Sequence, residues 1–423
     1  MSRPLAPPAR PARQTTNHLK QGKMQSDTDS QLDPRFSQQI PWWSDLDTAT
    51  HAMLELPDIS SLPAITVDVL VIGGGVAGLS AALSACQTGA QVLVLEAAPI
   101  LGWGATGRNA GILSAGINMH LIELDSAGPE AAFWPATTRL LLSLVNEATR
   151  PGAILSARLT GALSLAESAH AARKLAREAQ ARHAAGLRAE MWTPAQVTEL
   201  TQGRLSTESV VGALWLPDEG RIHPLTLLAH LAQQARSEGV VIAGCAHVDT
   251  YQEIPGKMES NYWQISLANG TIITARGLIR AVGPTAQPNQ RIYALAFAAD
   301  LPDSFPLFWD ASPYTYADFR PGNGRLTVSG GRYGKTGVTR RDATYHKRLA
   351  DAAHHWLPEL KGKEPAYTWG VDLAVSADMI PTLHNIGYAV PGFAIEGLGA
   401  LGVLPGIVLG HQAGKEIATI LSQ

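Results

Sequence analysis

One stretch in the first quarter of the chain constrains its fold more than any other feature. Residues 67–72 are short, β-branched and almost entirely apolar, as expected of a parallel strand covered on both faces. They lead directly into residues 73–78, which fit the pattern Gly-x-Gly-x-x-Gly, and residues 77–88 follow a helical pattern. A second apolar strand at 91–95 ends in Glu96. This order of strand, loop, helix, strand and acid predicts a dinucleotide-binding βαβ unit.

Each glycine of the pattern has its own physical role. Gly73 permits the tight turn, Gly75 lets a pyrophosphate approach the backbone, and Gly78 lets helix and strand touch. The start of the helix supplies free N–H groups and a partial positive charge for phosphates. The acid after the second strand can accept the hydroxyls of a ribose. We therefore expect cofactor contacts from Gly73, Gly75, Val76, Ala77, Gly78 and Glu96.

A second glycine-rich stretch follows the acid and favours FAD over a nicotinamide cofactor. Residues 101–111 hold four glycines, and the extended pyrophosphate of a flavin nucleotide needs contacts from a second loop. The Thr106 hydroxyl can bond phosphate oxygens, and the Arg108 guanidinium can neutralise them. The expected contacts of this loop are Ala105, Thr106, Gly107, Arg108, Asn109, Ala110 and Gly111.

The overall composition excludes several classes of protein. Of the 423 residues, 45% are hydrophobic and 16% charged, which is enough apolar material for a sizeable core. A formal net charge of −3 gives no electrostatic footprint for nucleic acid. The two cysteines cannot make a disulfide framework, and no spacing of ligands suggests a metal site. We expect a cytoplasmic globular protein with neither a metal nor a nucleic-acid partner.

Two segments imitate targeting or membrane signals. Residues 1–40 begin with a basic, proline-containing stretch that lacks the apolar segment of a secretory signal. They predict a disordered tail; a mitochondrial transit peptide is the alternative, although the prolines would break its helix. Residues 389–410 are apolar enough for a membrane span, but they hold six glycines, two prolines and Glu396. We expect buried backbone there and no integral membrane span.

The remaining patterns predict a discontinuous organisation. Helices are expected at 136–149, 167–186, 224–238 and 406–421, with a clean helix start at Thr193-Pro194. The second of these helices carries Arg173, Lys174, Arg177 and Arg182, interleaved with acids, and is interpreted as a solvated face.

Strand signals fill the space between these helices. Short strands are expected at 210–216, 240–242 and 248–251, and two hairpins surround Asn269-Gly270 and residues 321–324. The first hairpin joins strands at 263–267 and 271–273, and a separate strand at 278–282 returns to the first sheet.

Five separated motifs resemble the D-amino acid oxidase superfamily of FAD-dependent oxidoreductases, closest to its γ-glutamylputrescine oxidase-like branch. Besides the two glycine-rich loops, they are residues 220–224 (Gly-Arg-Ile-His-Pro), Phe319-Arg320-Pro321 with Gly330-Gly331-Arg332, and a C-terminal motif of Trp369-Gly370, residues 376–381 and the terminal glycine loop.

The resemblance implies an α/β fold in which a Rossmann-like FAD-binding domain carries an inserted antiparallel-sheet (α+β) substrate domain. The implied FAD-binding segments are 62–125, 205–248, 270–290 and 370–423. The implied substrate segments are 126–204 and 291–369.

The same resemblance implies non-covalent FAD and further contacts. Arg108-Asn109 stands where some relatives place a flavin-linking histidine. The further implied cofactor contacts are Val248, Gly283, Gly397, Gly399 and Leu401. The last three belong to a loop before the C-terminal helix, whose N–H groups can face the flavin.

The expected reaction oxidises a small amine or amino acid, with oxygen or another compound as electron acceptor. The substrate needs an anchor and an apolar site that keeps its amine neutral. Arg320 and Arg332 are the candidate anchors, since arginine grips a carboxylate with two bonds. Aromatic residues placed around the ring are Trp103, Tyr314, Tyr316, Phe319 and Trp369. We select Arg320, Arg332, Tyr316 and Trp369 as catalytic candidates.

Other charged residues nearby receive simpler interpretations. Arg325, beside a hairpin turn, is expected in solvent, and His223 before a helix either caps it or packs.

Two alternatives stay open. The fold could serve a hydroxyl substrate, or the chain could be a non-catalytic flavin-binding subunit that docks a partner through Trp42-Trp43. The unusually apolar terminal loop, residues 396–402, keeps the second of these open.

Overall fold

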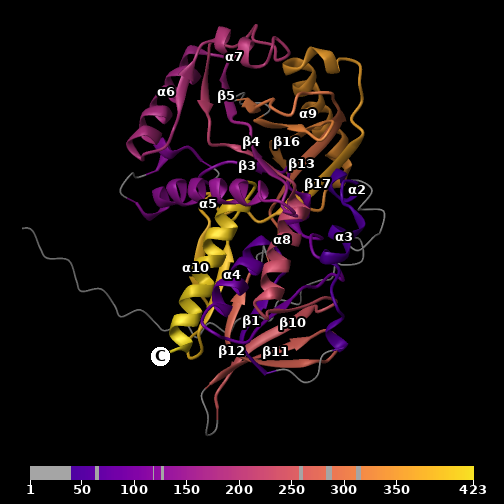
Figure 1. Cartoon of the computed structure of the whole chain (residues 1–423), viewed down its shortest axis with the longest axis vertical. Helices are drawn as coiled ribbons and strands as arrows, with labels where there is room; N and C mark the ends of the chain where they lie inside the picture. The colour runs from indigo at the N-terminus through magenta and orange to yellow at the C-terminus, as the bar shows by residue number, and fades with distance from the viewer. Residues whose placement is uncertain are drawn as a thin grey trace, which may run out of the picture.

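The computed structural model describes residues 40–61, 66–117, 119–124, 128–256, 261–282, 288–310 and 316–423; the side chain of Arg332 is outside this description. The chain forms two lobes, each built around its own sheet (Figure 1). Of the predicted N-terminal tail, only Ile40 lies within the described residues, and it is buried in the core.

The first sheet carries the predicted βαβ unit. Among the described residues its main strand order is β10-β11-β12-β1-β2-β9, and β19 and β18 extend it beside β12. The strands β1, β2, β9, β12 and β19 run parallel. The bounds are β1 Thr66–Ile72, β2 Val92–Leu95, β9 Val241–Ala243, β10 Val248–Ile254, β11 Tyr262–Leu267, β12 Ile272–Arg280, β18 Thr382–Asn385 and β19 Gly392–Glu396.

Three helices cover one face of this sheet: α4 (Val76–Cys86), α8 (Pro224–Ser237) and α10 (Val403–Leu421) (Figure 1). The small residues of α4 let α10 approach very closely. A side-chain carbon on Gly410 or Gly414 would collide with backbone carbonyls of α4, so glycine is required at these contacts. The start of α10 therefore lies beside the start of α4.

The second sheet has the order β17-β13-β16-β15-β14-β5-β7-β6 among the described residues. Its helices are α6 (Ala169–Ala184), α7 (Pro194–Leu200) and α9 (Asp342–Trp356). The strand bounds are β5 Ala162–Ala166, β6 Glu190–Trp192, β7 Gly212–Leu216, β13 Gln290–Ala298, β14 Leu307–Asp310, β15 Ala317–Gly322, β16 Arg325–Gly334 and β17 Tyr367–Leu373. One face packs on α9 through Phe297, Phe319 and Trp356.

Smaller elements join the two lobes. A sheet of β3 (Ile112–Leu113), β8 (Gly220–Ile222) and β4 (Ala157–Leu159) lies at the junction, and helix α5 (Phe133–Ala148) runs between the lobes (Figure 1). The N-terminal helices α2 (Pro41–Ser44) and α3 (Thr48–Leu54) pack against α8. Short 3₁₀ turns are Ile59–Ser61, Ala105–Arg108, Leu121–Glu123, Pro129–Ala132, Thr339–Arg341 and Pro358–Leu360.

The α/β fold class with a parallel sheet and an antiparallel sheet is confirmed, but several details were wrong. The predicted boundary at 205 comes too early, because β7 belongs to the second sheet. Residues 249–269, assigned to neither domain, supply β10 and β11 of the first sheet. The strands predicted at 271–273 and 278–282 form one continuous strand, β12, which pairs with β11 at one end and with β19 at the other.

Two elements in the C-terminal part of the chain have other boundaries than predicted. Strand β17 continues to Leu373, past the boundary predicted at 369, and α10 begins at Val403, three residues before the predicted start. No helix in the described part of the chain is long and apolar enough to cross a membrane.

Candidate cofactor and substrate site

The turn between β1 and α4 has the geometry that its glycines predict. Gly73 has φ +106°, and a Cβ there would lie 2.6 Å from the carbonyl oxygen of Ala281. Gly75 is the N-cap of α4 and has no capping side chain. Gly78 lies against the Gly73 carbonyl, where no side chain fits. The turn therefore presents the backbone N–H groups at the start of α4 at the carboxyl end of β1, where such units bind anions.

Glu96 lies at the end of β2, next to this turn. One carboxylate oxygen accepts the Gly74 N–H at 2.9 Å and the other accepts the Ala98 N–H at 3.1 Å. Burial raises the pKa of Glu96, while these backbone donors lower it. The carboxylate thus stabilises the turn, and its oxygens can still accept a further hydrogen bond. Val248 begins β10 two residues after Ala246, whose N–H bonds the Glu96 carbonyl at 2.9 Å.

The second glycine-rich loop touches the first. The Val76 N–H donates to the Thr106 hydroxyl at 3.3 Å, so this hydroxyl stands at the N-terminus of α4. The Asn109 side chain holds the loop's shape by donating to the Thr106 carbonyl at 2.6 Å and accepting the Gly111 N–H at 2.7 Å. The segment predicted to contact the cofactor therefore contacts the βαβ turn.

Arg108 connects this loop to the second sheet. Its carbonyl accepts the Trp369 indole N–H at 2.8 Å. Burial lowers the pKa of the Arg108 guanidinium to about 10, and the nearby charges that act on it are Asp372 and Arg291 of the second sheet. Trp369 is buried in β17, and its own carbonyl bonds the His346 ring at 2.9 Å.

Arg320, the first candidate anchor, is a buried residue. Its side chain is buried, with Nε 3.4 Å from the Gly111 carbonyl and Nη2 3.2 Å from the Ile222 carbonyl. The guanidinium carbon lies 4.8 Å from the Trp42 ring centroid. Its Nη1 is buried and has no hydrogen-bond partner among the described residues. Burial lowers the pKa of Arg320 to about 9.

The N-terminal segment closes this side of the site, which the sequence did not suggest. Trp42 is completely buried, and its indole donates to the Asn109 carbonyl at 2.9 Å, so it is not a docking residue for a partner. Arg325 is not in solvent: both its terminal nitrogens pair with the Asp45 carboxylate, one at 2.8 Å. His223 caps α8 through Nδ1, and burial lowers its pKa to about 4.

The remaining predicted site residues lie in the core, at the surface or outside the described part of the chain. Phe319 stacks on Phe308 in the core under α9, so it cannot line a ring-binding site. Tyr316 is 55% exposed just before β15. The structure describes only the backbone of Arg332, in β16, and both Gly283 and Tyr314 lie outside the described residues.

The terminal glycine loop turns tightly into α10. Gly397 and Gly399 have left-handed φ values of +70° and +59°, and Leu401 lies two residues before the helix begins. A Cβ on Gly406, in the first turn of α10, would lie 3.5 Å from the Val76 side chain. Two helix N-termini thus meet at the carboxyl ends of the parallel strands, the usual ligand position in such sheets.

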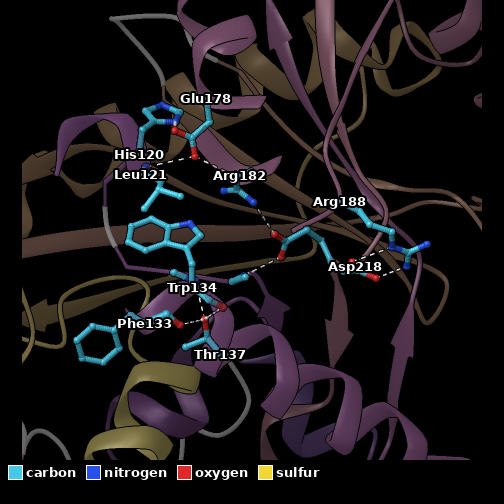
Figure 2. Close-up of polar contacts among 12 residues, drawn as sticks. His120, Leu121, Phe133, Trp134, Thr137, Glu178, Arg182, Arg188 and Asp218 are labelled. Atoms are coloured by element: carbon cyan, nitrogen blue, oxygen red, sulfur yellow. Dashed lines mark hydrogen bonds and ion pairs between the residues drawn. The ribbon is translucent and has the colours of Figure 1, made fainter. Parts of the chain in front are cut away.

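A buried charge cluster anchors the segment that follows the second loop (Figure 2). Arg182 lies 2.8 Å from Glu178 and 3.4 Å from Glu219. The Glu178 carboxylate also accepts the Leu121 N–H at 3.2 Å, and the Glu219 carboxylate accepts the Ala115 N–H at 2.9 Å. Arg182 is therefore not on a solvated face as predicted. The i, i+4 spacing of Glu178 and Arg182 was visible, but it is also typical of surface pairs.

Comparison with known proteins decides the family. The profile described as FAD dependent oxidoreductase (DAO) matches residues 68–416, most of the chain. The chain belongs to the DAO family of FAD-dependent oxidoreductases. The resemblance inferred from its motifs is thereby confirmed.

Individual proteins resemble this chain at low identity or over only part of its length. A segment of 83 residues is 43% identical to the gamma-glutamylputrescine oxidoreductase of Escherichia coli K12, covering 20% of this chain and 18% of that protein. Glycine oxidase from Geobacillus kaustophilus superposes with a TM-score of 0.70 at 20% identity, over 85% of this chain and 95% of that one. L-α-glycerophosphate oxidase from Mycoplasma pneumoniae gives 0.67 at 14%, over 84% and 95%. These structural likenesses establish the fold.

The residues present fit the FAD that the DAO family implies. Gly73 and Gly78 allow the close packing of the turn before α4, and Thr106 and Glu96 stand beside that turn with hydrogen-bonding capacity for phosphate and ribose. Among the described residues, no group of three or more His, Cys, Asp or Glu side chains could hold a metal ion.

Proposed function

We propose that this protein oxidises the C–N bond of an amine or amino acid, giving an imine that hydrolyses to an aldehyde or a keto acid. The observation that carries the proposal is Arg320, a buried guanidinium with an unpaired Nη1 beside the Gly111 carbonyl of the second loop. Such a group needs an anionic partner, and a substrate carboxylate would supply one. The names of the glycine oxidase and gamma-glutamylputrescine oxidoreductase relatives point to nitrogen-containing substrates.

FAD would be held without a covalent link and would supply the acceptor for a hydride equivalent. In this proposal Arg320 binds the substrate carboxylate, with Arg332 of the same hairpin as a second cationic candidate. The buried Trp369 would exclude water, which lowers the pKa of the substrate amine and favours its neutral form for oxidation. The N-terminus of α10, behind Gly397 and the other loop residues, would stabilise negative charge that develops nearby.

The first experiment tests the reaction class. The purified protein should be yellow and should release intact FAD on acid denaturation. Under anaerobic conditions, amino acids and amines should bleach the flavin absorption. Bleaching by 2-hydroxy acids or glycerol phosphate alone would replace this proposal with the hydroxyl reaction that the likeness to glycerophosphate oxidase favours. A flavin that none of these compounds reduces would indicate a non-catalytic subunit.

The second experiment tests the anchor. Arg320→Lys keeps the charge but loses the two-pronged geometry, so kcat/KM for carboxylated amines should fall by about 2–3 kcal/mol, and much less for uncharged amines. Rates are normalised to bound flavin, because Arg320 also contacts Gly111. Arg340→Lys, at an exposed arginine, is the matched control. Equal losses on both substrate types would assign Arg320 a structural role.

A further inference from the structure

Asp318 lies on the face of the second sheet that is turned toward the glycine-rich loop. Along β15 the side chains alternate, and Ala317 and Phe319 pack into the core under α9. Asp318 and Arg320 therefore share the opposite face, and Arg320 reaches the Gly111 carbonyl from there. The Asp318 carboxyl thus projects toward the same lobe junction as the proposed anchor.

The neighbouring strands support this placement. Asp318 is paired with Ser329 of β16, Ser329 with Ala294 of β13, and Ala294 with Trp369 of β17. Residues paired across strands lie on one face, and Trp369 at the end of this row bonds the Arg108 carbonyl. On the other side Asp318 is paired with Trp309. None of these neighbours carries a positive charge.

Asp318 has an unusual environment for a partly buried carboxyl. No described residue donates a hydrogen bond to it, and the charge that acts on it, Asp310, is also negative. Burial, and then Asp310, raise the pKa of Asp318 to about 7. By contrast, the buried carboxylates Glu178 and Glu219 each have an arginine partner. A carboxylate in such a position is costly unless a cation neutralises it.

We propose that Asp318 binds the ammonium group of the arriving substrate, takes one of its protons so that the amine is neutral for oxidation, and together with Arg320 selects molecules that carry both charges. This rests on the proposed oxidation of C–N bonds. Residues two apart on one strand have Cα atoms about 7 Å apart and side chains on the same face, so a ligand that reaches both groups must carry a cation and an anion. An α-amino acid meets this requirement, whereas a simple monoamine or a carboxylic acid meets only half of it. Asp318 is therefore the residue that favours amino acids over carboxylic acids that lack an amine.

The test compares three kinds of probe. They are the common α-amino acids in both enantiomers, their decarboxylated amines and their deaminated carboxylic acids. The amino acid with the highest kcat/KM on wild type is carried forward with its two analogues. Asp318→Asn should lower kcat/KM for that amino acid and its amine by 10- to 100-fold. The Kd of the deaminated acid, measured by calorimetry on the FAD-loaded protein, should change by less than 3-fold. Asp351→Asn, at an exposed aspartate paired with Lys347, is the control.

Several outcomes would overturn the inference. They are unchanged amino acid turnover in Asp318→Asn, an equal loss on all three probes, or a wild type that prefers the amine to the amino acid. If Asp318→Asn fails to retain FAD, Asp318→Glu takes its place. If Asp318→Glu still has a higher kcat/KM for the amino acid than for its decarboxylated amine, the role of Asp318 is supported. If this difference disappears while the flavin content stays full, the role is refuted. Flavin reduction by hydroxy acids alone would instead refute the proposed function itself.

Discussion

Replacing Arg182 by methionine should destabilise the protein far more than replacing a neighbouring surface arginine. The side chain of Arg182 is 10% exposed, and its partners Glu178 and Glu219 are 0% and 2% exposed. Removing one partner of a buried ion pair typically costs about 3–5 kcal/mol, because the remaining charge stays buried. Methionine keeps much of the apolar volume, so the cavity term is small.

The cost should also depend on pH in a defined direction. Burial raises the pKa of Glu219 to about 7, and Arg182 lowers it. Without Arg182 this pKa rises further, so the unpaired carboxyl is protonated at pH 6 and ionised at higher pH. A carboxyl whose folded pKa is raised destabilises the fold above its unfolded pKa, and this destabilisation is largest above its folded pKa. The deficit of Arg182→Met should therefore shrink by about 1–2 kcal/mol between pH 8.5 and pH 6.

The assay is equilibrium urea unfolding followed by circular dichroism. With an m-value of about 3 kcal/mol per molar, a 4 kcal/mol loss moves the midpoint down by about 1.3 M. Arg188→Met is the matched control, because Arg188 is 65% exposed and pairs with Asp218 in the same region (Figure 2). The control should lose no more than about 1 kcal/mol. Equal midpoints for the two variants, or a deficit of Arg182→Met that does not change with pH, would refute the reasoning.

Three further predictions concern the site. Glu96→Ala should weaken FAD binding by about 1–3 kcal/mol, since it removes the acceptor of the Gly74 N–H and the acceptor proposed for the ribose hydroxyls; flavin retention on dilution measures this, and full retention would contradict it. Gly78→Ala should prevent FAD uptake, because its Cβ would collide with the Gly73 carbonyl; a yellow variant would contradict the close approach. Asp318→Asn should raise stability at pH 8 by about 2 kcal/mol and by little at pH 4, because an unpaired carboxyl with a raised pKa destabilises the fold only above its unfolded pKa. Urea unfolding at the two pH values checks this, with Asp310 and Tyr333 as the other titratable groups that act on Asp318.

The cofactor half of the site was largely predictable because its signals are local. A strand, a glycine turn and a helix start are encoded by residues that follow one another, and the φ of Gly73 and the capping position of Gly75 match that expectation. The sequence predicted Thr106 as a phosphate contact, but the hydrogen bond that its hydroxyl accepts from the Val76 N–H was visible only in the structure.

The substrate half depends on which strands pair and which face each strand buries. Neighbouring residues of a strand lie on opposite faces, so an error of one residue moves a side chain to the other face. Phe319 was predicted in the site, but it packs under α9, and its neighbour Asp318 lies on the opposite face of the sheet. Trp42 and Asp45 reach Asn109 and Arg325 across 67 and 280 positions of sequence, a separation at which no pattern indicates contact.

Sequence by itself therefore determined the nucleotide-binding unit, the family and the order of most elements, because short-range patterns specify them. The tertiary structure alone decided which charges are buried together. Arg182 and Arg325 have ordinary surface spacing in the chain, yet each is paired inside the fold. The physical reason is that burial and charge pairing arise between elements distant in sequence, and these meet only when both sheets are assembled.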